Sequence, residues 1–163
     1  MASPKRKQGQ RPTLSVVLPH YNHAQLITRA LDAFVTQSVQ PDEILILDDC
    51  STDNSIEVIQ EYVDKYPNVK LYRATENAGT CINANRGLTM VTGEFVYWAA
   101  SDDYIHPGFF EKSLDMLAKH PEAMMSCTVG DWRDEVTGLI SHVGGQMGDR
   151  PAYYSPRDVI WLE

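Results

Sequence analysis

The sequence predicts an α/β fold with a mostly parallel central sheet covered by helices. Short runs of aliphatic and β-branched residues alternate with segments whose apolar residues recur at helical spacing, and this alternation repeats four times before Pro121. The chain has 163 residues, of which 43% are hydrophobic, and this suits one domain with a buried core. We therefore expect one α/β domain over residues 13–163, preceded by a disordered basic tail over residues 1–12.

Each of the four units pairs a strand with a helix. The predicted strands are residues 14–18, 43–47, 69–73 and 94–100, and the predicted helices are residues 26–35, 56–66, 80–91 and 109–119. The letters STDN, which precede the second helix, are residues that favour helix N-caps. Strands that alternate with helices in this way favour a parallel sheet.

The region after Pro121 has a different pattern. Residues 123–129 (AMMSCTV) predict a further strand, and a turn near Thr137 and Gly138 predicts a hairpin or a strand of different direction. The glycines Gly144, Gly145 and Gly148 indicate either a mobile lid or a plain flexible loop, and Ser155-Pro156 indicates the start of a helix. Because they lie in strand-like runs, Trp98, Met124 and Met125 are expected in the core.

Charge and cysteine content restrict the class of protein. The formal net charge is -8, although Lys5, Arg6, Lys7 and Arg11 are all in the tail, so the body is more acidic still and nucleic acid is not an expected partner. The tail itself could make weak contact with an anionic membrane surface. No apolar run suggests a transmembrane segment or a signal peptide, so we expect a cytoplasmic protein. Cys50, Cys81 and Cys127 are too widely spaced for a zinc site and are expected to be reduced thiols.

Three polar loops follow the first, second and fourth predicted strands. They read PHYNH (residues 19–23), DDCSTDNS (48–55) and SDDYIHP (101–107). Ligands of open α/β sheets bind at the carboxyl ends of the strands, so these loops are expected to share one site. Two of the loops carry acidic pairs, which suit a divalent cation, Mg2+ or Mn2+, that bridges a carboxylate to a diphosphate.

Each of these residues also has a simpler interpretation. Asp48 and Asp49 could form a helix-capping turn, and the pair at 102–103 could be a solvated loop that ends a strand. Tyr21 could pack over the end of the sheet. The histidines near the loops, His20, His23 and His106, are expected to have surface or capping roles rather than to ligate a metal.

Taken together, LSVVLPHYN, ILILDDCSTDNS and ENAGTCINANRGLTMVTGEFVYWAASDD, with the following IHP, resemble the N-terminal, nucleotide-sugar-binding part of a family 2 glycosyltransferase. The similarity covers about residues 14–121. It implies a Rossmann-like GT-A fold, with residues 13–163 as a nucleotide-sugar-binding domain that is truncated at its C-terminus. It also implies metal-dependent, inverting transfer of a sugar from a nucleoside-diphosphate sugar, a UDP-sugar by preference, to the hydroxyl of a glycan, lipid-linked or protein acceptor.

The resemblance also implies roles for individual residues. Pro19 and Tyr21 meet the nucleobase, Asp49 accepts a hydrogen bond from a uracil-type N3–H, and Asp102 lies near the ribose. The full set of implied nucleotide-sugar-binding residues is Pro19, Tyr21, Asn22, Asp49, Asn77, Gly79, Asn83 and Asp102, and the implied metal ligand is Asp103. The motif reads SDD, with Ser101 in its first place, and no Arg or Lys lies between Arg73 and Arg86. The acceptor-side base is expected after Glu163, so no catalytic residue is assigned.

Three other functional classes lead to different expectations. A truncated or degenerate transferase would bind the nucleotide sugar without catalysing transfer. A phospho-receiver also gathers acids at strand ends, but it needs an acidic pair after the first strand and a Lys after the fifth. Here PHYN follows the first strand, and no Lys follows Lys119. A sugar-nucleotide pyrophosphorylase would carry a glycine-rich, basic loop after the first strand, which this chain lacks.

Overall fold

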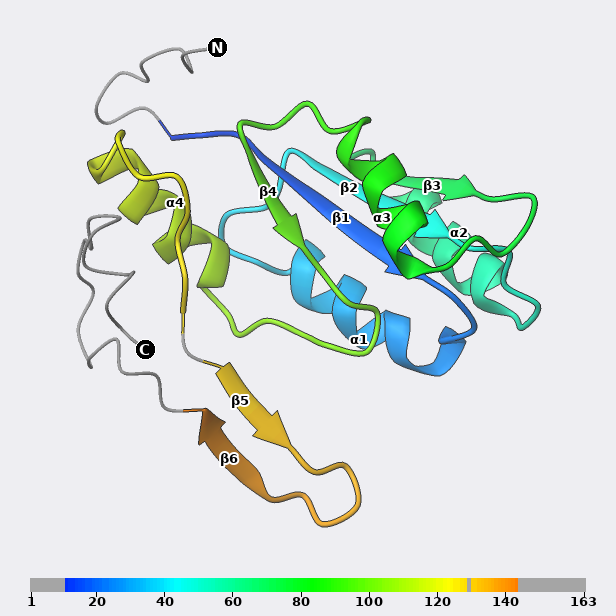
Figure 1. The fold of residues 1–163 in the computed structure, drawn as a ribbon. Helices are drawn as coiled ribbons and strands as arrows, with labels where there is room; N and C mark the ends of the chain where they lie inside the picture. Colours follow the sequence, from blue (N-terminus) through cyan, green and yellow to red (C-terminus); the bar gives the residue numbers. More distant parts are fainter. Residues whose placement is uncertain (1–10, 129, 144–163) are drawn as a thin grey trace.

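The computed structural model describes residues 11–128 and 130–143. Its centre is a parallel sheet of four strands in the order β3-β2-β1-β4, and β5 and β6 form a separate antiparallel hairpin (Figure 1). The predicted α/β architecture with a C-terminal hairpin is therefore confirmed. The elements are β1 (Leu14–His20), α1 (Ala24–Val35), β2 (Glu43–Asp48), α2 (Ser55–Lys65), β3 (Val69–Arg73), α3 (Thr80–Leu88), β4 (Phe95–Trp98), α4 (Phe109–Lys119), β5 (Gly130–Arg133) and β6 (Ile140–Val143).

The core lies on both faces of the two central strands, because every residue of β1 and β2 is buried. On one face, Val16, Leu18, Ile44 and Ile46 pack with apolar residues of α1, α2 and α4. On the other face, α3 lies over a smaller cluster that contains Val17, Leu45 and Leu47. Helices thus cover both faces of the sheet, as a parallel sheet requires.

The approach of α3 to the sheet depends on Gly87. A Cβ atom at this position would lie 2.7 Å from Cγ1 of Val17 and 3.1 Å from Cδ2 of Leu47. These distances are shorter than van der Waals contact, so only glycine lets the helix pack this closely. The close packing sets the position of Asn83, one turn earlier in α3.

Three expected core residues are exposed, and the prediction was wrong for each. Trp98 is 50% exposed, Met124 is 88% exposed and Met125 is 71% exposed. In the described sheet β4 is an edge strand that pairs with β1, and helices cover the face that carries Phe95 and Tyr97. Side chains alternate along a strand, so Val96 and Trp98 point to the other, uncovered face.

The strand predicted for residues 123–129 does not form over residues 123–128, which pair with no other strand in the described chain. Val129 lies outside the described residues, as do the three glycines after residue 143, the predicted helix start at Ser155-Pro156 and residues 1–10 of the predicted tail. Arg11, the first residue described, pairs with Asp42 at 3.5 Å. No helix in the described ranges has the length and hydropathy needed to cross a bilayer.

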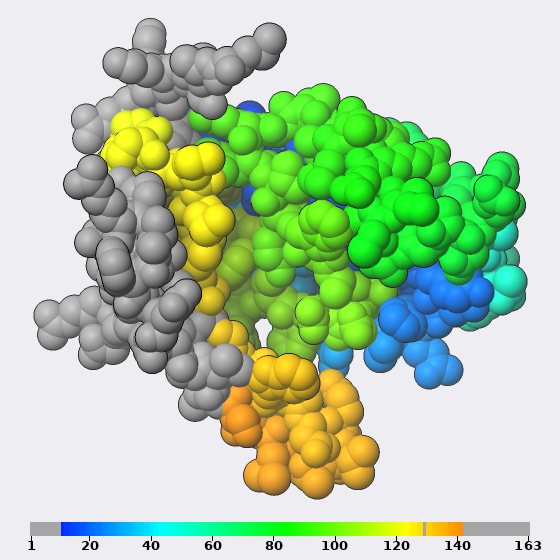
Figure 2. Space-filling view, viewed as in Figure 1, coloured from blue at the N-terminus to red at the C-terminus, as the bar shows by residue number. Residues whose placement is uncertain are grey.

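The hairpin lies away from the sheet. Figure 2 shows residues 130–143, coloured orange, projecting from the body of the domain. Its turn is closed by backbone hydrogen bonds from Asp134 to Leu139 and from Gly138 back to Asp134. Gly138 has a φ of 72°, which favours glycine, as the sequence predicted for this turn.

Candidate functional site

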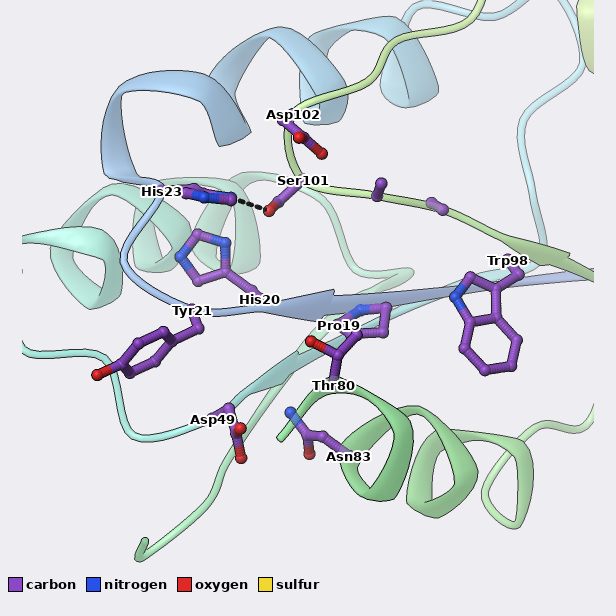
Figure 3. Close-up of a pocket in the computed structure, with 12 residues that line it drawn as sticks. Pro19, His20, Tyr21, His23, Asp49, Thr80, Asn83, Trp98, Ser101 and Asp102 are labelled. Carbon is purple, nitrogen blue, oxygen red and sulfur yellow. Dashed lines mark hydrogen bonds between the residues drawn. The ribbon is translucent and has the colours of Figure 1, made fainter. Parts of the chain in front are cut away.

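A pocket of about 300 Å³ lies at the carboxyl ends of β1, β2 and β4, beside the N-terminus of α3 (Figure 3). The twelve residues that line it are Pro19, His20, Tyr21, His23, Asp49, Thr80, Asn83, Trp98, Ala99, Ala100, Ser101 and Asp102. The three polar loops predicted from the sequence therefore do meet, and the start of α3 completes the wall. This is the edge at which open parallel sheets bind ligands.

Tyr21 follows β1 and is 42% exposed at the pocket. Part of this side chain is therefore accessible to a ligand in the pocket. Pro19 lines the same pocket from within β1, where it is paired with Leu47 of β2. An aromatic ring and an apolar ring that line one pocket are suited to a planar ligand.

Asn22, although predicted to bind the nucleotide sugar, is not among the residues that line the pocket. Its Oδ1 accepts hydrogen bonds from the backbone N–H groups of Thr52 at 2.8 Å and Asp53 at 3.3 Å. Its own N–H donates to Oγ of Ser51 at 3.0 Å. Its φ of 52° lies in the left-handed region, which Asn tolerates better than most residues. In this structure Asn22 joins the loop after β1 to the loop after β2.

Asp49 is 3% exposed, and its carboxylate is held by two backbone donors. Oδ1 accepts from the N–H of Ala78 at 3.1 Å, and Oδ2 accepts from the N–H of Gly79 at 2.8 Å. Gly79 is the N-cap residue of α3 and has a φ of 89°. The carboxylate thus lies at the positive end of the α3 dipole and orders the turn before that helix.

The two acids of the Asp48-Asp49 pair have different surroundings. Asp48 is completely buried, its Oδ2 accepts from the N–H of Ser51 at 3.1 Å, and Arg73 lies 3.6 Å away. Asp48 thus stabilises the turn that follows β2, whereas Asp49 holds the turn before α3 and lines the pocket.

Of the other residues predicted to bind the nucleotide sugar, Asn83 lines the pocket, whereas Gly79 and Asn77 do not. Asn83 lines the pocket, and its Nδ2 donates to the carbonyl oxygen of Leu47 at 2.6 Å. Gly79 donates its N–H to Asp49 and is not among the lining residues. Asn77 is exposed and is not among the lining residues.

The two acids after β4 also differ. Asp102 is exposed and lines the pocket together with Asp49, whereas Asp103 is exposed but is not a lining residue. Asp103 instead affects the titration of Tyr97. Burial is the larger cause that raises the pKa of the Tyr97 phenol, and the negative charge of Asp103 is the smaller one. The preceding Ser101 is 5% exposed, and its Oγ is hydrogen-bonded to Nδ1 of His23 at 2.8 Å.

His20 and His23 belong to the loop that was expected at the site, and both line the pocket. His20 was expected at the surface, but β1 continues to this residue and places it beside Asp48 of β2, so it is 2% exposed. Neither of its ring nitrogens has a hydrogen-bond partner in the described chain. Burial lowers its pKa from 6.5, and the charges of Asp48 and Asp53 oppose that shift only in part, so the ring is neutral at pH 7.

The metal-ligating side chains of the pocket suit only a cation site that is completed by ligands from the substrate and water. In the described ranges no three His, Cys, Asp or Glu side chains are grouped so that they could hold a metal ion by themselves. Magnesium and manganese often take one or two carboxylates from the protein and their other ligands from substrate phosphates and water. None of the twelve lining residues is Lys or Arg. The residues therefore fit a cation that binds together with a diphosphate and offsets its charge.

Comparison with known proteins identifies relatives over most of the chain. The family model described as Glycosyl transferase family 2 matches residues 15–157. An uncharacterized glycosyltransferase, YibD of Escherichia coli, is 34% identical over 125 residues, which are 77% of this chain and 36% of the relative. A poly(ribitol-phosphate) beta-glucosyltransferase of Bacillus spizizenii is 37% identical over 95 residues, which are 56% of this chain and 15% of the relative.

Solved structures show the same fold. TarS 1-349 of S. aureus in complex with UDP-GlcNAc is 31% identical, with a TM-score of 0.62 over 66% of this chain and 32% of that one. The mannosyltransferase PcManGT of Pyrobaculum calidifontis, in complex with GDP-Man and Mn2+, is 28% identical, with a TM-score of 0.57 over 76% of this chain and 35% of that one. This chain thus spans less than half the length of these relatives. With its predicted GT-A fold and its pocket at the carboxyl edge of the sheet, the chain belongs to glycosyl transferase family 2.

Proposed function

We propose that this chain is the donor-binding part of a glycosyltransferase that transfers a sugar from a UDP-sugar to an acceptor hydroxyl, with inversion and with the help of a divalent cation. One observation carries the proposal: Tyr21, Asp49 and Asp102, which come from three separate loops, line a single pocket. The complexes of the related TarS with UDP-GlcNAc and with UDP support the choice of nucleotide.

The base would lie between Tyr21 and Asp49. Each carboxylate oxygen has two acceptor sites, and at Asp49 the backbone of Ala78 and Gly79 uses one on each oxygen. The remaining sites can accept the N3–H of uracil. Cytosine has an acceptor at the same ring position, and two facing acceptors repel each other. Asp49 would therefore favour UDP over CDP.

The cation would be held at the Asp102-Asp103 pair. Because Asp102 lines the pocket and Asp103 does not, we assign the metal contact to Asp102, in place of the assignment to Asp103 that the resemblance implies. When bound, such a cation supplies positive charge that stabilises the departing diphosphate. The chain's own residues hold the donor, and an acceptor hydroxyl that attacks the anomeric carbon from the face opposite the diphosphate gives inversion.

Calorimetric titration of UDP, CDP and GDP, each with and without Mn2+, tests the proposal. For the wild type, we expect UDP to bind best, and Mn2+ to strengthen its binding. Asp102→Asn should weaken binding in the presence of Mn2+ by about tenfold, because a charged ligand loses its partner. Asp103→Asn is the neighbouring comparison, and Asp115→Asn, an exposed acid of α4, is the remote control.

The outcomes separate the parts of the proposal. Absence of UDP binding would contradict the assigned donor, and equal binding with and without Mn2+ would contradict the role of the cation. A larger loss of UDP affinity for Asp103→Asn than for Asp102→Asn would assign the metal contact to Asp103, as the resemblance implies. The binding-only alternative predicts the same titrations, and it is separated by measuring transfer of labelled sugar from UDP-sugars by the full protein.

A further inference from the structure

The loop between β4 and α4, residues 99–108, is attached to α1 along the length of that helix. At the start of α1, His23 is hydrogen-bonded to Ser101 at 2.8 Å. Just past its end, Nε2 of Gln37 donates to the carbonyl oxygen of His106 at 3.0 Å. Between them, Nη2 of Arg29 donates to the carbonyl oxygen of Asp102 at 2.9 Å. This last bond acts on the residue that the proposed function places against the cation.

The guanidinium of Arg29 has two further contacts. Nη1 donates to Oε1 of Glu135 in the turn of the β5–β6 hairpin at 2.6 Å. The guanidinium carbon also lies 4.9 Å from the ring centroid of Tyr104, which is part of the same loop as Asp102. Such a combination of two directed bonds and a stacked face uses the planar, forked shape of arginine, which lysine lacks.

The hairpin contacts the loop at a second point. Nε2 of His106 lies 3.2 Å from Oδ2 of Asp131 in β5. The Arg29 hydrogen bond and charge also lower the pKa of Glu135, as expected for a carboxylate that keeps its charged partner. The hairpin, which projects from the domain in Figure 2, is thus connected to the pocket through two side chains, Arg29 and His106.

We propose that Arg29 is a positioning residue for Asp102: it fixes the backbone at Asp102, and Glu135 of the hairpin holds its guanidinium in the orientation that does so. The proposal rests on the proposed function, because the position of the Asp102 carboxylate matters only if it meets a cation and a diphosphate. A loop that is ordered before binding loses less conformational entropy when the ligand binds. Docking of the hairpin would therefore strengthen metal-dependent nucleotide binding without touching the nucleotide.

Two measurements on matched variants test this role. Arg29→Met keeps the apolar stem and loses the donors, Arg29→Lys keeps the charge and loses the fork, and Glu135→Gln keeps the shape and loses the charge. Arg86→Met, at an exposed arginine in the last turn of α3, is the control. The first measurement is hydrogen–deuterium exchange of the amides of residues 101–106 without ligand. The second is UDP affinity with and without Mn2+.

For Arg29→Met we expect loop exchange to rise and the gain in UDP affinity from Mn2+ to fall, each by about tenfold, as for loss of a hydrogen bond from a charged group. Exchange in β1 and β2 and metal-free UDP binding should not change. Arg29→Lys and Glu135→Gln should lie between this variant and the wild type, and Arg86→Met should match the wild type.

Unchanged loop exchange in Arg29→Met would overturn the proposal. The proposal would also be overturned if loop exchange in Arg29→Met became faster while the gain in UDP affinity from Mn2+ stayed at its wild-type value. Arg29 would then order the loop without positioning Asp102. Wild-type behaviour of Glu135→Gln in both measurements would overturn the part played by the hairpin. If the wild type itself shows no gain from Mn2+, the proposed function fails, and the exchange measurement still decides whether Arg29 holds the loop.

Discussion

Asp49 combines a structural contact with a proposed recognition role, and the two can be separated by comparing ligands. Its carboxylate orders the turn before α3 and also lines the pocket. A substitution that only loosened this turn would weaken all nucleotides alike. A change in the ratio of UDP to CDP affinity therefore reports the base contact alone.

For Asp49→Asn we expect UDP affinity to fall about tenfold, the usual cost when a charged partner of a hydrogen bond is lost. The preference for UDP over CDP should narrow, because an amide NH2 can donate to N3 of cytosine. Calorimetric titration of both nucleotides measures the ratio. Asp115→Asn should leave the ratio of UDP to CDP affinity unchanged. If Asp49→Asn also kept the wild-type ratio, Asp49 would not distinguish the bases.

The buried imidazole of His20 predicts a dependence of stability on pH. Burial lowers its pKa in the folded state below the ordinary value of 6.5, so the unfolded state takes up a proton at higher pH than the folded state does. The free energy of unfolding should therefore be highest above about pH 6.5 and fall as the pH drops below it. Urea unfolding at several pH values between 5 and 8 measures this slope.

A variant separates His20 from the other histidines. His20→Gln should flatten the dependence in this pH range, whereas His120→Gln, at a half-exposed position after α4, should retain it. An equal slope in the wild type and in His20→Gln would mean that the folded-state pKa of His20 is not lowered.

At the scale of elements, the strands and helices of the sheet were predictable because their signals are local. The repeated aliphatic runs located β1 to β4 in order, and the apolar spacing located α1 to α4. The face of an edge strand was not predictable in this way. Tyr97 and Trp98 are neighbours in one apolar run, and only the packing of Phe34 and Phe110 against Tyr97 decides which of them is buried.

The site was predictable to a similar extent and for a similar reason. The loops that carry Tyr21, Asp49 and Asp102 follow strands, so their convergence follows from a parallel sheet. The contact of His23 with Ser101 joins residues 78 positions apart, and no periodicity in the sequence indicates it. The supporting role of Asn22 likewise depends on the distant backbone of Thr52 and Asp53.

The close packing of α3 on the sheet gives a prediction for Gly87. Alanine is the better helix former by about 1 kcal/mol, but its Cβ would lie 2.7 Å from the stiff side chain of Val17, and overpacking a core costs about 1 to 3 kcal/mol. We expect Gly87→Ala to lower the free energy of unfolding by about 1 kcal/mol in net. Urea unfolding measures the change.

Gly130 provides the matched control, since a Cβ there has no neighbour within 4 Å. Gly130→Ala should alter stability by less than about 0.5 kcal/mol, as substitutions away from packed sites usually do. Equal or greater stability of Gly87→Ala would show that α3 can move outward without cost, and the position of Asn83 would then not depend on this contact.

At the scale of the whole molecule, the charge of the protein supports the proposal that a cation assists the binding of a diphosphate. The net charge is -8, two acids line the pocket, and no Lys or Arg is among its lining residues. A nucleoside diphosphate is itself an anion, so the protein repels it over distances comparable to the Debye length, about 10 Å at 0.1 M salt. A divalent cation bound in the pocket, as proposed, would reverse the sign of the local interaction.

Added salt should therefore have opposite effects on UDP affinity in the absence and in the presence of the metal. Without Mn2+, raising NaCl from 20 to 200 mM screens the repulsion, and we expect UDP affinity to rise by about twofold. With saturating Mn2+, the same change screens an attraction, and the affinity should fall. Uridine, which lacks the phosphates, should respond to salt in neither condition. If salt weakened metal-free UDP binding instead, a positively charged group outside the twelve lining residues would have to bind the phosphates, and the cation would no longer be required to offset their charge.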